Sequence, residues 1–276
     1  MSRVIFTPSS GATLTFETGN AADYRLVDLQ GIALPPLNPF TVKGPRQPGE
    51  TLADVIVAPR IVELTGRLQA ATEQELWNLR AAAIATLSVQ PARLQGSLSL
   101  GLLTVEIDNM PVREIDAIAQ SAELIRPRGA VPISPIDVEF YCPFPYWRPT
   151  ADTTTAFVVN DTTDITNHGD VDTPIQVQFT GTTFTQVKIR NMTTGEDIIV
   201  DYTAASEDYL EVTTGYGDKR VQKLTAGTAV SRMQDLDAAD SIMWQLRPGV
   251  NSVKFECTGD AGATVDVIHR PLYSGL

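Results

Sequence analysis

The sequence predicts a mainly β protein of two domains, the first containing one helix and the second a β-sandwich. Short segments in which apolar and polar residues alternate recur along the whole chain, as in half-buried strands. A helical period occurs once, and a stretch rich in Thr, Asp and Asn follows Thr150. With 276 residues, of which 43% are hydrophobic, the chain is long enough for two cores. We therefore expect domains at residues 1–150 and 151–276.

The first domain is predicted to surround its helix with strands. Arg3–Phe6 and Ala12–Phe16 have the pattern of short strands joined by a turn, and Tyr24–Ile32 alternates as a third strand. Val55–Leu68 is rich in β-branched residues and interrupted by a proline, which predicts one bulged strand or two consecutive ones. Strand patterns return at residues 94–140. This order predicts an α+β domain in which the helix crosses an antiparallel sheet or split barrel.

The single helix is predicted at about residues 73–88. Thr72 and Glu75 have the spacing of a capping box, in which each side chain binds the backbone N–H of the other residue. Apolar residues then recur at helical spacing until Pro91. Those expected to face the sheet are Leu76, Leu79, Ala83 and Leu87.

A long segment at residues 33–54 (ALPPLNPFTVKGPRQPGETLAD) interrupts the first domain with five prolines. Irregular segments of this length are uncommon inside a compact domain and usually serve a function or fold against something else. We interpret the segment as an arm that clasps a neighbouring subunit. A loose surface loop is the alternative, and the two are about equally compatible with the sequence.

The charges are unequally divided between the halves. Residues 1–150 hold 12 basic and 15 acidic residues, whereas residues 151–276 hold 9 and 18. Eleven of the 12 basic residues in the first half are Arg, which suits partly desolvated protein contacts, although GC-rich codon usage explains the same bias. The residues that we assign to subunit contacts are Pro39, Phe40, Arg46, Arg60 and Arg67.

The first domain is predicted to end at an aromatic cluster. The strand in Val138–Arg148 (VEFYCPFPYWR) is stopped by two prolines, Pro143 and Pro145. The end of this strand carries four aromatic residues within seven positions, so a large apolar area lies where regular strand pairing ends. We interpret three of these aromatic residues as a structural plug under the domain: Phe144, Tyr146 and Trp147.

The second domain shows short strand patterns separated by turn signals at the spacing of a β-sandwich. A short strand is expected first at Ala156–Asn160. The later strands are expected at Pro174–Thr180, Gln186–Asn191, Asp197–Tyr202, Tyr209–Thr213, Arg220–Leu224, Ile242–Arg247, Ser252–Cys257 and Thr264–Arg270.

The composition argues against several partners. The net charge of −12 disfavours binding to phosphate backbones and to anionic membrane surfaces. The chain starts without an apolar segment of signal-peptide length and has no 18-residue apolar run, so we expect a soluble chain made in the cytoplasm without membrane insertion. Cys142 and Cys257 fall in different predicted domains and are interpreted as free thiols.

No catalytic or metal-binding motif is found. His168 and His269 lack partners at metal-ligand spacing, and no nucleophile elbow or phosphate-binding loop occurs, so no metal and no cofactor is expected. Three acidic residues, Asp235, Asp237 and Asp240, could contact Ca²⁺, but an acidic turn is the favoured interpretation. For a paired-carboxylate glycosidase the candidates are Glu106, Asp108 and Glu139, and a solvated strand face is the favoured alternative. For a sugar-binding face they are Trp147, Trp244, Tyr209 and Tyr216, with Trp244 more readily explained as core.

The chain resembles the distal tail proteins of siphophage-type bacteriophages, and the resemblance covers nearly all of it. The segments that carry it, in order, are PRIVELTGRL at 59–68, DVEFYCPFPYWRPT at 137–150, ITNHGDVDTPIQVQFTG at 165–181, IRNMTTGEDIIVD at 189–201, WQLRPGVNSVKFE at 244–256 and VDVIHRPLYSG at 265–275. Together their order and spacing are fairly specific. The exit Phe144-Pro145-Tyr146 departs from the more common Asp-Pro-aromatic form.

The resemblance implies a structural virion protein without enzymatic activity. Its N-terminal domain would form a hexameric ring that continues the tail tube, and a galectin-like β-sandwich would face outward. The implied partners are the tail-tube protein, the tape-measure protein and the baseplate hub, with assembly in the host cytoplasm and a final place at the phage tail tip. The net negative charge suits a ring through which DNA slides without sticking. The alternatives are a lectin-like protein that binds host-surface glycans and, more remotely, a glycoside hydrolase.

Overall fold

The chain forms two compact units, which we describe separately. The computed structural model describes residues 2–9, 11–19, 22–88, 100–124, 132–204, 208–225 and 227–276. Unit 1 comprises Met1–Thr150 and Ser274–Leu276, and unit 2 comprises Ala151–Tyr273. The last three residues thus differ from the predicted division, which placed them in the second domain. The start of the predicted strand region, residues 94–99, lies outside the described residues.

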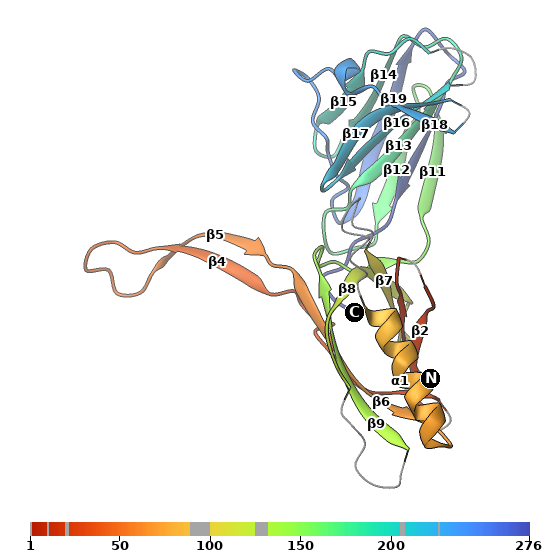
Figure 1. The fold of residues 1–276 in the computed structure, drawn as a ribbon. Helices are drawn as coiled ribbons and strands as arrows, with labels where there is room; N and C mark the ends of the chain where they lie inside the picture. Colours follow the sequence, from red (N-terminus) through yellow and green to blue (C-terminus); the bar gives the residue numbers. More distant parts are fainter. Residues whose placement is uncertain are drawn as a thin grey trace. The chain divides into compact units, whose positions relative to one another are not determined.

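Unit 1 is built on a closed barrel of seven strands (Figure 1). The strands around the barrel are β8 (Arg113–Leu124), β7 (Gly101–Glu106), β1 (Arg3–Thr7), β2 (Leu14–Glu17), β3 (Tyr24–Gln30), β6 (Arg60–Gln69) and β9 (Ile133–Cys142), and β9 pairs back with β8. All these pairs are antiparallel except β2–β3, which meets through Glu17 and Arg25. The short strand β10 (Arg148–Pro149) pairs with the start of β8. The prediction of an antiparallel barrel or sheet is confirmed.

Strict alternation in β6 and β9 gives the barrel its core. Every second residue of β6 from Val62 onward is buried, and the same holds for β9 from Ser134 to Cys142. Phe6 of β1 and Phe140 of β9 meet across the core with ring centroids 4.9 Å apart. Because side chains alternate between the two faces of a strand, one face of each strand is removed from water. The hydrophobic effect on these inward faces holds the barrel together.

The helix α1 (Glu73–Leu87) agrees with its sequence signals. The Thr72 hydroxyl accepts a hydrogen bond from the Glu75 N–H at 3.3 Å, and the Glu75 carboxylate accepts one from the Thr72 N–H at 3.1 Å, which confirms the capping box. The buried helix residues are Leu76, Ala83 and Leu87. Leu79 is half-buried, and its carbonyl accepts a hydrogen bond from the Tyr24 hydroxyl at 2.9 Å. The helix packs on β6 and β8.

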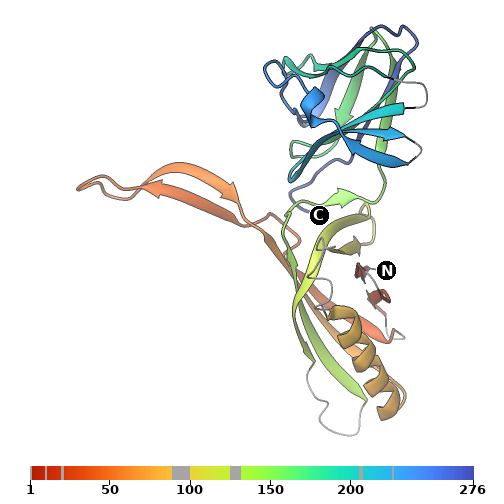
Figure 2. The same cartoon turned by 45° about the horizontal axis from the view of Figure 1, so that its top comes forward.

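The proline-rich segment is a two-stranded antiparallel ribbon, β4 (Leu37–Val42) and β5 (Thr51–Val57), and we call residues 37–57 the arm. It extends away from the barrel of unit 1 (Figure 2). The expectation of an irregular segment was therefore wrong. Pro39 is accommodated because each strand of an isolated ribbon has a free edge, where a missing N–H costs no ladder hydrogen bond.

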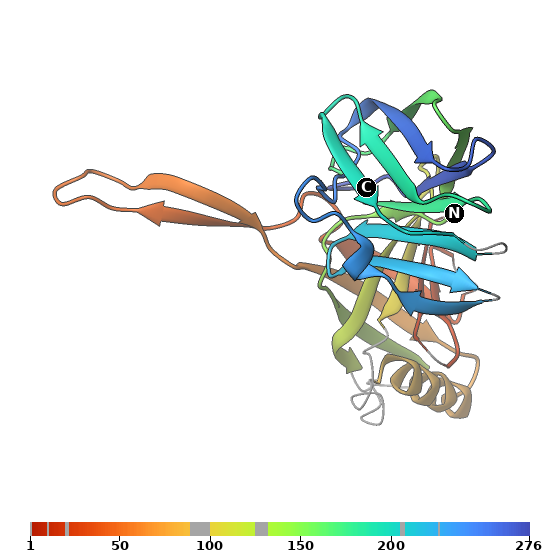
Figure 3. The same ribbon diagram turned by 90° about the horizontal axis from the view of Figure 1, so that it is seen from above.

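Unit 2 is a β-sandwich of two antiparallel sheets, as predicted, and its strands appear in two layers in Figure 3. The larger sheet has the order β11 (Thr153–Val158), β20 (Thr264–His269), β13 (Ile175–Thr180), β16 (Asp208–Gly215), β17 (Asp218–Thr225) and β18 (Thr228–Ser231). The smaller has the order β12 (Thr162–Asn167), β19 (Gly249–Thr258), β14 (Gln186–Asn191) and β15 (Glu196–Val200). A 3₁₀ turn, η2, spans Met233–Asp235.

The two sheets enclose a separate core. Phe179 of the larger sheet and Phe255 of the smaller one lie with ring centroids 5.6 Å apart, and both are fully buried. Trp244 is 2% exposed in the same core, and its indole N–H donates to the Ile189 carbonyl at 3.4 Å. Ile242–Arg247, predicted as a strand, makes only an isolated bridge between Leu246 and Thr173. Trp244 and Leu246 of this segment belong to the core without joining a sheet, whereas Ile242 is exposed.

Two strands of unit 2 were missed by the sequence patterns. β12 (TTDITN) and β18 (TAVS) contain few apolar residues. Both are edge strands, β12 of the smaller sheet and β18 of the larger. Edge strands are less enclosed than central strands, so their sequences carry a weaker hydrophobic signal.

Candidate subunit interface

The arm concentrates exposed hydrophobic side chains. Among the described residues, 20 large hydrophobic side chains are exposed, and six of them lie on the 13 strand residues of the arm. These six are Leu37, Phe40, Val42, Leu52, Val55 and Ile56. Single exposed hydrophobic residues are normal, but a contiguous group of this kind marks an interaction surface.

The pairing register sorts the arm residues into two faces. Leu37 lies opposite Val57 and Pro39 lies opposite Val55, so these four apolar residues share one face. The other face carries Phe40 and Ile56, which are 52% and 51% exposed and lie opposite the polar residues Asp54 and Asn38. A two-stranded ribbon cannot bury either face by itself. The apolar face therefore requires a second surface to cover it.

The tip of the arm is a tight turn. The Gln47 N–H donates to the Gly44 carbonyl at 3.2 Å, and the Gln47 side chain accepts from the Gly44 N–H at 3.0 Å. Arg46 is exposed in this turn with a φ of +63°. The structure thus brings three of the predicted contact residues, Pro39, Phe40 and Arg46, onto one arm, and their role in subunit contacts stays a prediction.

Arg60 does not agree with its predicted role as a subunit contact. Its side chain is 1% exposed, because it lies inside unit 1 at the root of the arm. Nη1 donates to the carbonyls of Gly31 at 2.8 Å and Ala33 at 2.6 Å, and Nε donates to the Pro145 carbonyl at 2.9 Å. Nη2 donates to the carbonyl of Ser274. The guanidinium therefore holds three segments of its own unit against β6.

The local electrostatics of Arg60 follow from its burial. Burial lowers the pKa of Arg60 from its usual value, because a charged group loses hydration inside the protein. The four carbonyl dipoles replace that hydration, and the Arg60 Cζ lies 5.7 Å from the centroid of the Trp147 ring. The Cys142 thiol is also buried here, and burial raises its pKa to about 12, so it stays protonated at neutral pH.

The predicted aromatic plug is divided by burial. Trp147 is fully buried, whereas Phe144 and Tyr146 are half-buried. Their two rings form an edge-to-face pair with centroids 5.2 Å apart. The three residues lie between β9 and β10, in the segment that leaves unit 1. Their role as a plug stays a prediction.

Arg67 lies away from the arm, on β6. It is half-buried and belongs to the set of β6 side chains that faces away from the core. Its register partners are Arg25 on β3 and Pro135 on β9. The structure therefore does not bring Arg67 together with the three contact residues on the arm.

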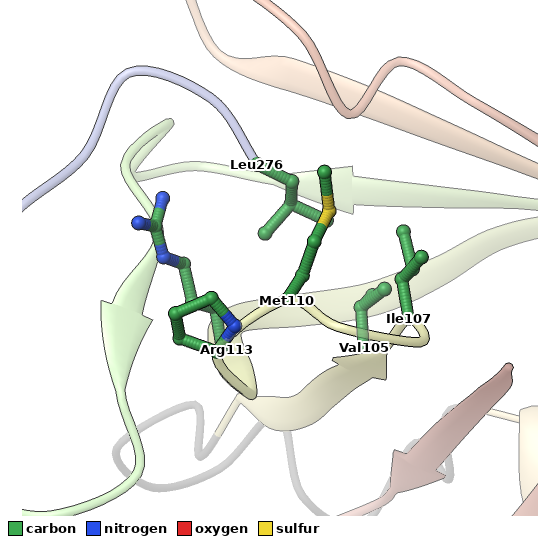
Figure 4. Close-up of a pocket in the computed structure, with 6 residues that line it drawn as sticks. Val105, Ile107, Met110, Arg113 and Leu276 are labelled. Atoms are coloured by element: carbon green, nitrogen blue, oxygen red, sulfur yellow. The ribbon is translucent and has the colours of Figure 1, made fainter.

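A segment that the sequence reasoning missed completes the root of the arm. The Leu276 N–H donates to the Ile32 carbonyl at 3.0 Å, and Arg113 Nη1 donates to the Gly275 carbonyl at 2.6 Å. Leu276 also lines an apolar cavity of about 190 Å³, where its side chain lies beside that of Met110 (Figure 4). The other lining residues are Val105, Ile107, Pro111 and Arg113. The lining consists of apolar side chains and one guanidinium, a composition that suits the packing of apolar groups.

Three of the acidic candidates, Asp235, Asp237 and Glu106, bind other groups of the protein. Among the described residues, no group of three or more His, Cys, Asp or Glu side chains could hold a metal ion. Asp235 forms an ion pair with Arg232 at 3.8 Å, and the Asp237 carboxylate accepts from the Ala239 N–H at 3.1 Å, as in a capped acidic turn. Glu106 binds Arg3.

In the part of the chain that is described, no helix combines the length and the apolar composition needed to cross a lipid bilayer.

Comparisons with known proteins agree with this architecture. Residues 168–273 match the family described as the C-terminal domain of the siphovirus-type tail component. The crystal structure of the phage SPP1 Dit protein, described as a paradigm of the hub adsorption apparatus in phages that infect Gram-positive bacteria, superimposes with a TM-score of 0.72 and 14% identity. The match covers 98% of this chain and 99% of that chain.

Two structures of the phage P2 baseplate in its activated conformation, with Ca and with Sr, also match. Their TM-scores are 0.56, their identities are 9% and 10%, and each match covers 97% of this chain and 98% of the other. No curated protein sequence matches the chain significantly. The resemblance to distal tail proteins is confirmed by the family match and the shared fold. Residues 168–273 therefore match the C-terminal domain of siphovirus-type tail components, and the chain as a whole has the fold of the phage SPP1 Dit protein.

Proposed function

We propose that six copies of this chain form a ring at the distal end of a phage tail tube and join the tube to the tail-tip hub. The chain acts in this proposal as a structural protein without catalytic activity. The observation that carries the proposal is the arm, whose apolar face is exposed in the single chain. A symmetric ring offers each arm an equivalent surface on the next copy, so every exposed face is covered without new partners.

The matched proteins support the location in this proposal, and the partners are those that the resemblance implies. The SPP1 protein is described as part of a hub adsorption apparatus, and the P2 structures are baseplates. By analogy we place this chain in the virion, at the tail tip, after assembly in the host cytoplasm. Its neighbours there would be the tail-tube protein, the tape-measure protein and the hub. The charge of −12 favours a lumen that DNA can pass without binding.

Native mass spectrometry over a range of concentrations tests the ring. One copy has a mass of 29.9 kDa, so a hexamer has six times this mass, about 179 kDa. We expect this species to grow at the expense of the monomer as concentration rises, and to appear as rings in negative-stain images. A protein that remains monomeric up to its solubility limit would contradict the proposal.

The glycan-binding alternative is not favoured. Trp244, one of its aromatic candidates, is 2% exposed and belongs to the core of unit 2. Trp147, another candidate, is fully buried in unit 1. For the remote hydrolase alternative, we expect a polysaccharide-cleavage assay with the purified chain to show no products.

A further inference from the structure

We propose that Ser274–Leu276, which we call the strap, lock the root of the arm together with Arg60 and so prepare the arm to bind a second copy of this chain. The root is Gly31–Pro36, which leads into β4. The strap belongs to unit 1 although it follows unit 2 in the sequence. The part of this inference that concerns a second copy rests on the proposed function. The part that concerns the root stands on the contacts alone.

The root is held by the strap on one side and by Arg60 on the other. The carbonyls of Gly31 and Ala33 accept hydrogen bonds from Arg60, and the Ile32 carbonyl between them accepts from the Leu276 N–H. Arg60 also donates to the Ser274 carbonyl, so the same guanidinium joins the root to the strap. Three consecutive carbonyls of the root are thus fixed by one buried side chain and one backbone group.

The strap has its own anchors. Arg113 on β8 donates to the Gly275 carbonyl at 2.6 Å, and the Leu276 side chain lines the apolar cavity beside Met110. Gly275 lies so close to the root that a Cβ there would be 3.2 Å from the carbonyl carbon and oxygen of Ala33. A side chain at this position would therefore crowd the Ala33 backbone and strain the contact between the strap and the root. The root also lies close to β6. Gly31 of the root has a φ of +76° and lies against the Ile61 backbone.

A fixed root matters because the arm has little to hold it otherwise. Its strands pair only with each other, and the Ala58 N–H to Pro36 carbonyl bond at 2.9 Å closes the ribbon at its base. An arm on a loose root would sample many directions, and binding would have to remove that freedom. A root that is already ordered lowers this entropic cost, which is the usual benefit of preorganisation.

The test compares the full chain with two variants that disturb the strap in different ways. Gly275→Val adds a side chain against Ala33, and deletion of residues 274–276 removes the strap without adding atoms. The matched control is Gly215→Val, because a Cβ at Gly215 would meet only the Asp218 Cβ at an ordinary 3.8 Å. Circular dichroism and the unfolding midpoint show which variants remain folded. If Gly275→Val does not fold, the deletion variant carries the test.

The first readout is hydrogen exchange of peptides that cover the root and both strands of the arm, measured on the monomer. We expect both strap variants to exchange there at least about tenfold faster than wild type, with the barrel strands and the Gly215→Val control unchanged. Unchanged exchange at the root in a folded strap variant would overturn the inference. This readout does not depend on whether the chain assembles.

The second readout is the concentration at which half of the chains are assembled. We expect it to rise at least about tenfold in the strap variants, in step with the faster exchange. Faster exchange with unchanged assembly would overturn the link between the strap and the second copy. If wild type itself never assembles, the proposed function and this link both fail, while hydrogen exchange still decides whether the strap orders the root.

Discussion

At the scale of single residues, the buried guanidinium of Arg60 joins distant segments of unit 1. A guanidinium has five N–H donors in a planar fork, and here it donates to four carbonyls from three separate stretches of chain. Burial of a cation is costly unless its donors are satisfied. Once they are satisfied, removal of the side chain leaves the carbonyls without partners, so the loss is large.

We predict that Arg60→Met destabilises unit 1 by about 3 kcal/mol, since the buried carbonyls lose charge-assisted hydrogen bonds. The measurement is a urea titration in a Trp244→Phe background, so that the remaining tryptophan fluorescence comes from Trp77 and Trp147 in unit 1. Arg46→Met, at the exposed arm tip, is the matched control and should stay within about 0.5 kcal/mol of wild type. Equal stabilities of the two variants would refute the role assigned to Arg60.

His269 gives unit 2 a pH-dependent stability. Its side chain is 3% exposed, and burial lowers its pKa below the usual 6.5, an effect that nearby His168 reinforces and the Thr166 backbone opposes. The native state therefore keeps His269 neutral at pH values where the unfolded chain already binds a proton. The stability that this neutral side chain contributes is complete above pH 6.5 and is lost as the pH falls toward the lower native pKa.

We predict that the thermal unfolding midpoint of unit 2 falls between about pH 7.5 and about pH 5, and that His269→Leu reduces this fall. The midpoint is followed by calorimetry at a series of pH values. His168→Leu is the matched control, because His168 is exposed and only reinforces the effect of burial on His269, and it should reduce the fall much less than His269→Leu. The same slope in the two variants would show that His269 is not the titrating group.

At the scale of elements, α1 and the arm are stabilised in opposite ways. The helix has a complete capping box and buries Leu76, Ala83 and Leu87 within its own unit. The arm has two paired strands but no second layer, so its apolar face is not buried within the chain. The helix is therefore stable in the single chain, whereas the arm needs a partner to use its hydrophobic area.

We predict that Thr72→Ala destabilises unit 1 by about 1 kcal/mol, because the first turn of α1 loses the acceptor for the Glu75 N–H. The unfolding free energy is measured by the same fluorescence titration. Thr65→Ala, at an exposed position of β6, serves as the comparison and should have a smaller effect. A similar loss in both variants would indicate that the capping box adds little.

We predict that Val55→Asp abolishes assembly while leaving the barrel folded. Val55 is 39% exposed on the apolar face of the arm, so the change places a charge where we expect a desolvated contact. Val230→Asp is the matched control, because Val230 is 48% exposed on β18 of unit 2. Sedimentation velocity should show the monomer for the first variant and the wild-type distribution for the second. Assembly of Val55→Asp at wild-type concentrations would rule out this face of the arm.

At the scale of the whole molecule, the chain has two independent cores. The core of unit 2 is one cluster drawn from both of its sheets, with all members between Phe157 and Val267. We predict that residues 151–273, expressed alone, fold cooperatively and stay monomeric at concentrations at which the full chain assembles. The measurements are calorimetry and native mass spectrometry. Assembly of the isolated unit would place the subunit contacts outside unit 1.

The features that were predicted correctly depend on neighbours along the chain. The capping box needs only Thr72 and Glu75, and the strands of the barrel core show alternation within ten residues or fewer. In the segment at residues 33–54 the same local reasoning failed, because its five prolines obscured the strands LNPFTV and TLADVIV. The turn at Gly44 and Gln47 and the β-branched run in β5 were the signals that could have identified a hairpin.

The role of Arg60 depends on residues that come together only in the fold. In the sequence, Arg60 lies in a run of β-branched residues. Because arginine suits partly desolvated protein contacts, we predicted that Arg60 lies at a subunit interface. Its partners Gly31, Pro145 and Ser274 lie 29, 85 and 214 residues away, and no short window contains them. Burial and capping within an element can be predicted from residues close in sequence, whereas the partners of a buried cation are chosen by how distant segments pack. Local patterns thus specified the elements of this protein, and packing over long sequence separations decided which of its arginines hold the fold and which remain exposed for a partner.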